Sequence, residues 1–102
     1  MTEESIHNVV AMKKDMGLSH QEFFASLTTL AREIPCQVTD KGVVVAYDSG
    51  EIRIGLGPES ERQLGSINLA RTWVSLEFHN LSDEQQNRFL ERFDLAFHRG
   101  GG

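Results

Sequence analysis

The stretch "DMGLSHQEFFASL", residues 15–27, decides the fold of this chain. A glycine-containing turn, a serine cap and an amphipathic helix are typical of the start of a DNA-binding helix-turn-helix, which needs a second, recognition helix shortly afterwards. Here the apolar stripe runs on to Ile34, Pro35 ends the helix, and a β-rich segment follows. The stretch therefore predicts a capped corner, and DNA binding through a partial helix-turn-helix is a disfavoured alternative.

Two segments, residues 19–34 and 82–99, have the pattern of capped amphipathic helices. Each begins with a serine that is followed three residues later by glutamate or glutamine, which together form a capping box. Each has one apolar stripe and therefore needs another surface to cover it. The stripes consist of Phe23, Phe24, Leu27, Leu30, Ala31 and Ile34 in the first helix, and of Phe89, Leu90, Phe93, Ala96 and Phe97 in the second.

The N-terminal segment also has loosely helical apolar spacing. The residues concerned are Ile6, Val9, Val10 and Met16. We predict a third helix over about residues 3–15, which Gly17 would close. Residues 1–5 and 100–102 are expected to fray at the two ends of a single domain spanning 1–102.

Between the two capped helices, the apolar period changes from about 3.6 to 2, which indicates β-strands separated by tight turns. Four strands are predicted, over residues 36–39, 43–47, 51–56 and 67–78. Residues 57–66 read as a looser connection. In the last strand the apolar positions change from odd to even numbers, which predicts a bulge or bend near residues 70–72.

These elements predict an α+β fold, specifically a two-layer sandwich. A four-stranded antiparallel meander would have the helices, at about 3–15, 19–34 and 82–99, packed mainly on one face. Strand order is open, because a meander is only the default for short connections.

Composition limits the possible functions. The 102 residues are 39% hydrophobic and carry a formal net charge of −5, from 15 acidic and 10 basic side chains. An acidic chain opposes the electrostatic attraction on which nucleic-acid binding depends. No apolar run approaches the ~18 residues of a membrane span, and no secretory segment is evident. We expect a cytoplasmic protein with neither nucleic acid nor membrane as its partner.

Catalytic and metal-binding patterns are weak. Cys36 is the single cysteine, and as a nucleophile it would need a base such as His20, His79 or His98 brought close by the fold. The histidines lack metal-ligand spacing, and the glycines at 55 and 57 do not complete a phosphate-binding loop. We expect no cofactor and no metal. A thiol-dependent enzyme centred on Cys36 is an alternative to a protein without catalytic activity.

The final residues, "FHRGGG", are similar to the Arg-Gly-Gly tail of ubiquitin-like modifiers and sulfur carriers. In those families the C-terminal carboxylate is activated, and the tail leaves a strand of a β-grasp fold, whereas here it follows a predicted helix. The resemblance implies a carrier activated at Gly102. A glycine cap followed by a frayed end is the other interpretation.

The strongest candidate site lies on the sheet face away from the helices. If the even-numbered residues of the last strand point inward, Arg71 and Trp73 point outward, and Arg53 does so on the preceding strand. Exposed tryptophan with arginine is typical of binding hot spots. The structural alternative is that residues 57–66 or the N-terminal helix half-cover Trp73, with arginine stacked on it. We predict a non-catalytic binding module for a protein partner or small ligand, and a homodimer through the same face is equally natural.

Overall fold

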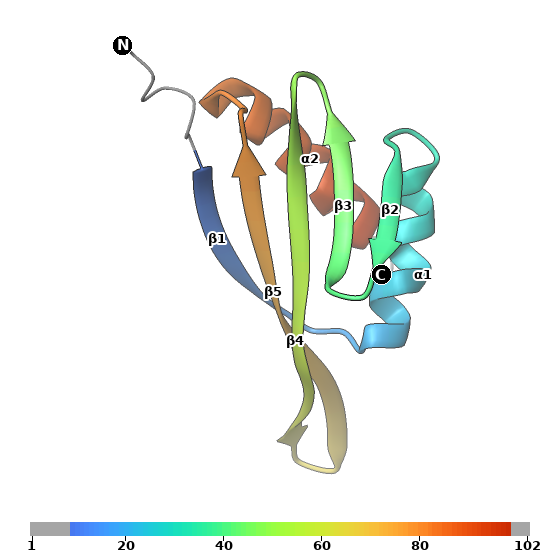
Figure 1. Cartoon of the computed structure of the whole chain (residues 1–102). Helices are drawn as coiled ribbons and strands as arrows, with labels where there is room; N and C mark the ends of the chain where they lie inside the picture. Colours follow the sequence, from blue (N-terminus) through green and yellow to red (C-terminus); the bar gives the residue numbers. More distant parts are fainter. Residues whose placement is uncertain (1–8, 99–102) are drawn as a thin grey trace.

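The computed structural model describes residues 9–98, which form an α+β fold with a five-stranded antiparallel sheet (Figure 1). The sheet order is β1-β5-β4-β3-β2. Both helices lie behind the sheet in the view of Figure 1, on the same face. The elements are β1 (Val9–Met16), α1 (His20–Ala31), β2 (Cys36–Thr39), β3 (Gly42–Tyr47), β4 (Gly50–Leu64), β5 (Ile67–His79) and α2 (Asp83–His98).

Both capped helices are confirmed, although α1 ends at Ala31, before the predicted end at residue 34. The Ser19 hydroxyl accepts a hydrogen bond from the backbone N–H of Glu22 at 3.0 Å, and the Glu22 carboxylate accepts one from the Ser19 N–H at 2.8 Å. Ser82 and Gln85 make the same reciprocal pair at the start of α2. Because the helices satisfy their own first N–H groups, their start points follow from local sequence. The expected cap at Gly100 and fraying of 100–102 lie outside the described residues.

The predicted N-terminal helix is wrong over the residues that the structure describes, and residues 3–8 lie outside them. Val9–Met16 form strand β1, which pairs antiparallel with β5 from Val9 opposite His79 to Met16 opposite Thr72. Met12 and Met16 pack on the core, whereas Ala11 is exposed. This alternation has the period of a strand. Gly17 therefore follows a strand rather than a helix, and β1 raises the strand number from the predicted four to five.

The predicted loop over residues 57–66 is also wrong. Strand β4 continues to Leu64, and Gly65 and Ser66 alone connect it to β5. Gly65 has φ +62°, which suits the first central position of a two-residue hairpin turn. The meander β2-β3-β4-β5 is as predicted, but its last hairpin is much longer than expected.

The bulge lies in β4 rather than at residues 70–72 of β5. Leu56 pairs with Val74 and Glu59 with Thr72, so Gly57 and Pro58 together face Trp73. Proline has no N–H for the ladder and is tolerated at such a bulge. Because β5 is unbroken, its odd-numbered and even-numbered residues keep their respective faces from end to end.

The core lies between the two helices and one sheet face, which we call the covered face. Phe93 and Phe97 of α2 stack with ring centroids 4.3 Å apart, and Phe97 lies 4.9 Å from Phe23 of α1. These rings pack on the alternating apolar residues of β3, β4 and β5. The fully buried apolar residues of these strands are Val43, Val45, Ile52, Ile54, Val74, Leu76 and Phe78.

The distal part of the β4–β5 hairpin, residues 59–72, extends beyond both helices, and we call it the arm (Figure 1). The molecule measures 58 × 26 × 25 Å, and its radius of gyration of 14.9 Å exceeds the roughly 13 Å expected of a chain of this length. The predicted two-layer sandwich therefore does not describe the whole sheet.

The corner that contains Leu18 and His20 holds the base of the arm. The buried Thr72 hydroxyl donates to the Leu18 carbonyl at 2.8 Å. The His20 N–H, at the start of α1, donates to the Glu59 carboxylate at 2.9 Å, and the His20 ring lies 2.8 Å from the Gly57 carbonyl oxygen. A carboxylate suits a helix N-terminus, where the backbone dipoles are positive. The stretch that resembles half of a DNA-binding motif thus positions the arm.

Candidate functional site

The sheet face away from the helices, which we call the open face, carries a row of large apolar side chains along the arm. Trp73, Leu69 and Ile67 on β5 are 54%, 44% and 59% exposed, and Leu64, directly opposite Ile67 on β4, is 50% exposed. These four residues form the apolar stripe. Their alternating partners on β5 from Thr72 onward are buried beneath the helices. The stripe is therefore apolar surface that the fold itself does not cover.

The structure brings two of the three predicted site residues together. Arg71 and Trp73 are neighbours on the open face of β5, because residues two apart in a strand share a face. The Arg71 guanidinium pairs with the Asp15 carboxylate of β1 through two nitrogens, with 3.2 Å between Nε and Oδ1. Asp15 lies directly opposite Trp73. The ion pair fixes the end of β1 against β5 and neutralises Arg71 beside the stripe.

Arg53 lies on the same face but apart from the other two. It is opposite Glu77, four residues along β5 from Trp73, which corresponds to about 13 Å at the usual strand rise. Its Nε donates to the Glu51 carboxylate at 2.6 Å. The structure therefore does not join Arg53 to the Arg71–Trp73 pair.

Sequence reasoning missed the other three members of the stripe. Ile67, Leu69 and Trp73 share odd numbers, which place them on one face of an unbroken strand. That signal was available, but the expected bend at 70–72 assigned Ile67 and Leu69 to the core. Leu64 was missed because residues 57–66 were interpreted as a loop.

A shallow hollow of about 480 Å³ lies on the open face beyond Trp73. Among its lining residues Gly55 is opposite Ser75, and a Cβ at Gly55 would lie 2.7 Å from the Ser75 hydroxyl oxygen. The absent side chain thus helps to keep the surface hollow. The charged residues that line it include both signs: Lys41, Glu51, Arg53 and Glu77.

Cys36 has a different environment from that of an activated nucleophile. It is partly buried against the core, and its Sγ donates to the Ile34 carbonyl at 3.2 Å. Burial raises the pKa of the Cys36 thiol above its ordinary value. The hydrogen bonds found within residues 9–98 do not connect Cys36 to a histidine. The thiol is protonated at neutral pH and is a poor nucleophile in this state.

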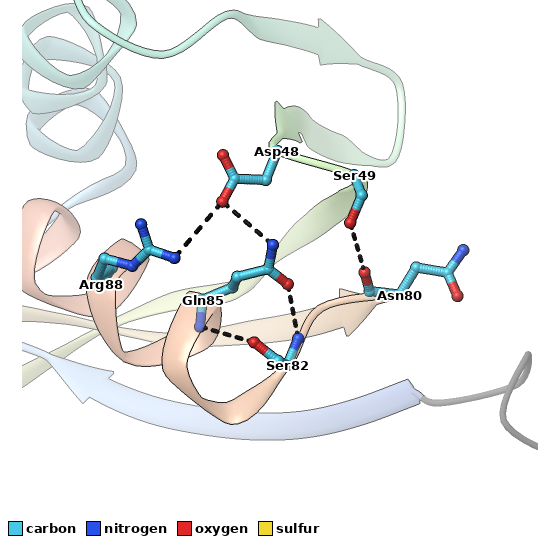
Figure 2. Close-up of polar contacts among 6 residues, drawn as sticks. All are labelled: Asp48, Ser49, Asn80, Ser82, Gln85 and Arg88. Carbon is cyan, nitrogen blue, oxygen red and sulfur yellow. Dashed lines mark hydrogen bonds and ion pairs between the residues drawn. The ribbon is translucent and has the colours of Figure 1, made fainter.

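A second group of polar side chains lies around the β3–β4 turn and the start of α2 (Figure 2). This turn is at the opposite end of the sheet from the arm (Figure 1). Gln85 donates to the Asp48 carboxylate at 3.3 Å, and Arg88 approaches the same oxygen at 3.9 Å. The Ser49 hydroxyl donates to the Asn80 carbonyl at 3.4 Å. These contacts attach the β3–β4 turn to the start of α2, so the structure accounts for this group as a support of the fold.

The described residues offer few other sites. Within residues 9–98, no three His, Cys, Asp or Glu side chains gather closely enough to hold a metal ion. Neither α1 nor α2 has the length and apolar character needed to cross a membrane. The Gly-Gly tail lies outside the described range. Comparison of the chain with protein-family models, curated proteins and solved structures finds no match.

Proposed function

We propose that this chain is a non-catalytic binding module that contacts a protein partner through the open face of its arm. The observation that carries the proposal is the apolar stripe, in which four large apolar side chains are each about half exposed. Exposed apolar area costs roughly 25 cal/mol for each Å². Exposed apolar side chains gathered around an arginine, as Leu69 and Trp73 are around Arg71, are typical of surfaces that a partner covers.

Side-chain contacts hold the base of the arm in place. Thr72 and Glu59 join the base of the arm to the corner before α1, and Arg71 joins it to Asp15 of β1. A surface that is already ordered loses less conformational entropy on binding. The arrangement favours recognition by a preformed surface.

The shape of the stripe favours a protein over a small ligand. From Ile67 to Trp73 it extends about 20 Å along one strand, at the usual rise for each residue. Small-molecule sites are concave and enclose most of the ligand surface. An extended, protruding row suits a second protein surface. The single cysteine, which cannot form a disulfide within the chain, supports a cytoplasmic location.

Site-specific photo-crosslinking in the native host cells tests this proposal. A benzophenone amino acid replaces Trp73 in one variant and Leu95, an exposed leucine of α2, in the matched control. We expect the variant at position 73 to form a covalent adduct with a protein that mass spectrometry identifies, and the further change Leu69→Asp to remove it. Equal adducts at both positions, or none at position 73, would contradict the proposal.

A further inference from the structure

We propose that the partner of the apolar stripe is a second copy of this chain, packed open face to open face with the two arms antiparallel. This inference rests on the proposed function and names the occupant of the same surface. In the pair, the tip of each arm lies over the hollow of the other copy, and the central parts of the two stripes pack together.

The open face carries a projection at one end and a hollow at the other. The arm tip projects with Leu64 and Ile67, both at least half exposed. At the other end of the same two strands, Gly55 has no side chain and lies in the hollow of about 480 Å³. Two identical surfaces in reversed orientation fill both hollows with both tips at once. This is the self-complementarity of a two-fold interface.

The strand register defines where the symmetry axis passes. The two-fold axis passes at Arg71, perpendicular to β5 and parallel to the sheet. Leu69 of one copy then lies over Trp73 of the other, because each is two residues from the axis. The same operation places the Leu64–Ile67 pair of the tip over the Gly55–Ser75 pair of the hollow. Leu69 and Trp73 thus face each other, Leu64 faces the empty position at Gly55, and Ile67 faces the small side chain of Ser75.

The charges on this face permit such a pairing despite the net charge of −5. The two Arg71 side chains approach each other at the axis, but each is already paired with Asp15 of its own chain. Arg53 is likewise paired with Glu51 beside the hollow. Like-charge repulsion is therefore reduced on the surface that two copies would share.

The area of β4 and β5 alone suits a weak, reversible dimer, whose interface is smaller than the standard one. A 13-residue strand is about 43 Å long, and two strands are about 10 Å wide, which gives roughly 400 Å² in projection for β4 and β5. Side chains that stand off the sheet, and the adjoining parts of β1 and β3, add to this area. A standard interface buries about 800 Å² for each partner.

Sedimentation equilibrium of the purified full chain tests the inference, from low micromolar to submillimolar concentration. We expect a reversible dimer of twice the 11.5 kDa chain mass. Leu69→Asp and Leu69→Lys should both give monomers with an unchanged far-UV circular dichroism spectrum. The control Leu95→Asp, at the more exposed leucine on α2, should leave the dimer intact. A monomeric wild-type chain at every concentration would overturn the inference.

Disulfide trapping tests the register. In a Cys36→Ser background, a mixture of the Leu69→Cys and Trp73→Cys variants should form mixed disulfide dimers faster than either variant alone. Equal trapping by Leu95→Cys would contradict the proposed interface. The purified chain could be monomeric while position 73 still crosslinks to a different protein in cells. That result would overturn the proposal that the partner is a second copy, but it would leave the proposed binding module standing. Absence of any adduct at position 73 would contradict both.

Discussion

The two faces of strand β5 both carry apolar residues, but the helices bury those of one face and leave those of the other exposed. Leu76 points to the covered face and has no exposed surface, whereas Leu69, on the same strand, points to the open face and is 44% exposed. The helices pack over the first and leave the second uncovered. A strand pattern shows which residues share a face, but the helices determine which apolar face stabilises the fold. The other is available to a partner.

The largest effect that we predict is a difference in the free energy of unfolding between two leucine-to-alanine variants of this strand. Leu76→Ala removes a buried side chain and should lower the free energy of unfolding by about 2–5 kcal/mol. Leu69→Ala removes an exposed one and should change the free energy of unfolding of the monomer by no more than about 0.5 kcal/mol. Urea denaturation at a concentration where the chain is monomeric measures both.

Similar losses from the two truncations would contradict this difference between the faces. They would mean that the monomer itself needs the stripe for stability, and the stripe would no longer support a binding function. Leu95→Ala, on the exposed side of α2, serves as the reference for an exposed leucine outside the sheet.

The covered face was predictable from sequence because its signals are local. Each capping box lies within four residues, and the apolar stripe of each helix follows directly from its spacing. The turns between β2, β3 and β4 lie in short polar segments. Strand β1 was not predictable in this way, because its partner β5 is about sixty residues away in the chain. Loosely spaced apolar residues suited either a helix or an edge strand.

The open face was predicted only in part. The outward orientation of Arg71 and Trp73 followed from the even-numbered core residues of β5. The change from odd to even apolar positions in β5 was wrongly attributed to a bulge in that strand, whereas the bulge lies at Gly57 and Pro58 of β4. In fact Ile67 and Leu69 are apolar without facing the core. A strand pattern cannot distinguish an apolar residue that a helix covers from one that it does not.

A smaller difference in stability is expected between variants that remove one hydroxyl group from each face. Thr72 is buried and donates to the Leu18 carbonyl at 2.8 Å, so Thr72→Val leaves that carbonyl without its partner and should cost about 1–3 kcal/mol of unfolding free energy. Ser75 makes a longer contact of 3.4 Å with the Gly55 carbonyl on the open face. Ser75→Ala should therefore cost less, as urea denaturation can show. A neutral Thr72→Val would mean that the corner does not hold the arm.

The smallest effect concerns the thiol at the margin of the covered face. Burial raises the pKa of Cys36, so a smaller fraction is thiolate at neutral pH than in the unfolded chain. Reaction with a chromogenic disulfide should be slower than after unfolding in urea, and slower than for Leu95→Cys in a Cys36→Ser background.

The raised pKa of Cys36 also determines whether the stability of the fold rises or falls with pH. Because the folded chain holds the thiol proton to higher pH, Cys36 adds no slope to stability below the unfolded pKa. Above it the unfolded state loses its proton first, so stability falls as the pH rises through the folded pKa. Cys36→Ser should lack this decline in a comparison of urea midpoints. If folded Cys36 reacts as fast as the unfolded thiol, the covered face does not protect it, and a thiol-dependent enzyme again becomes a competing interpretation.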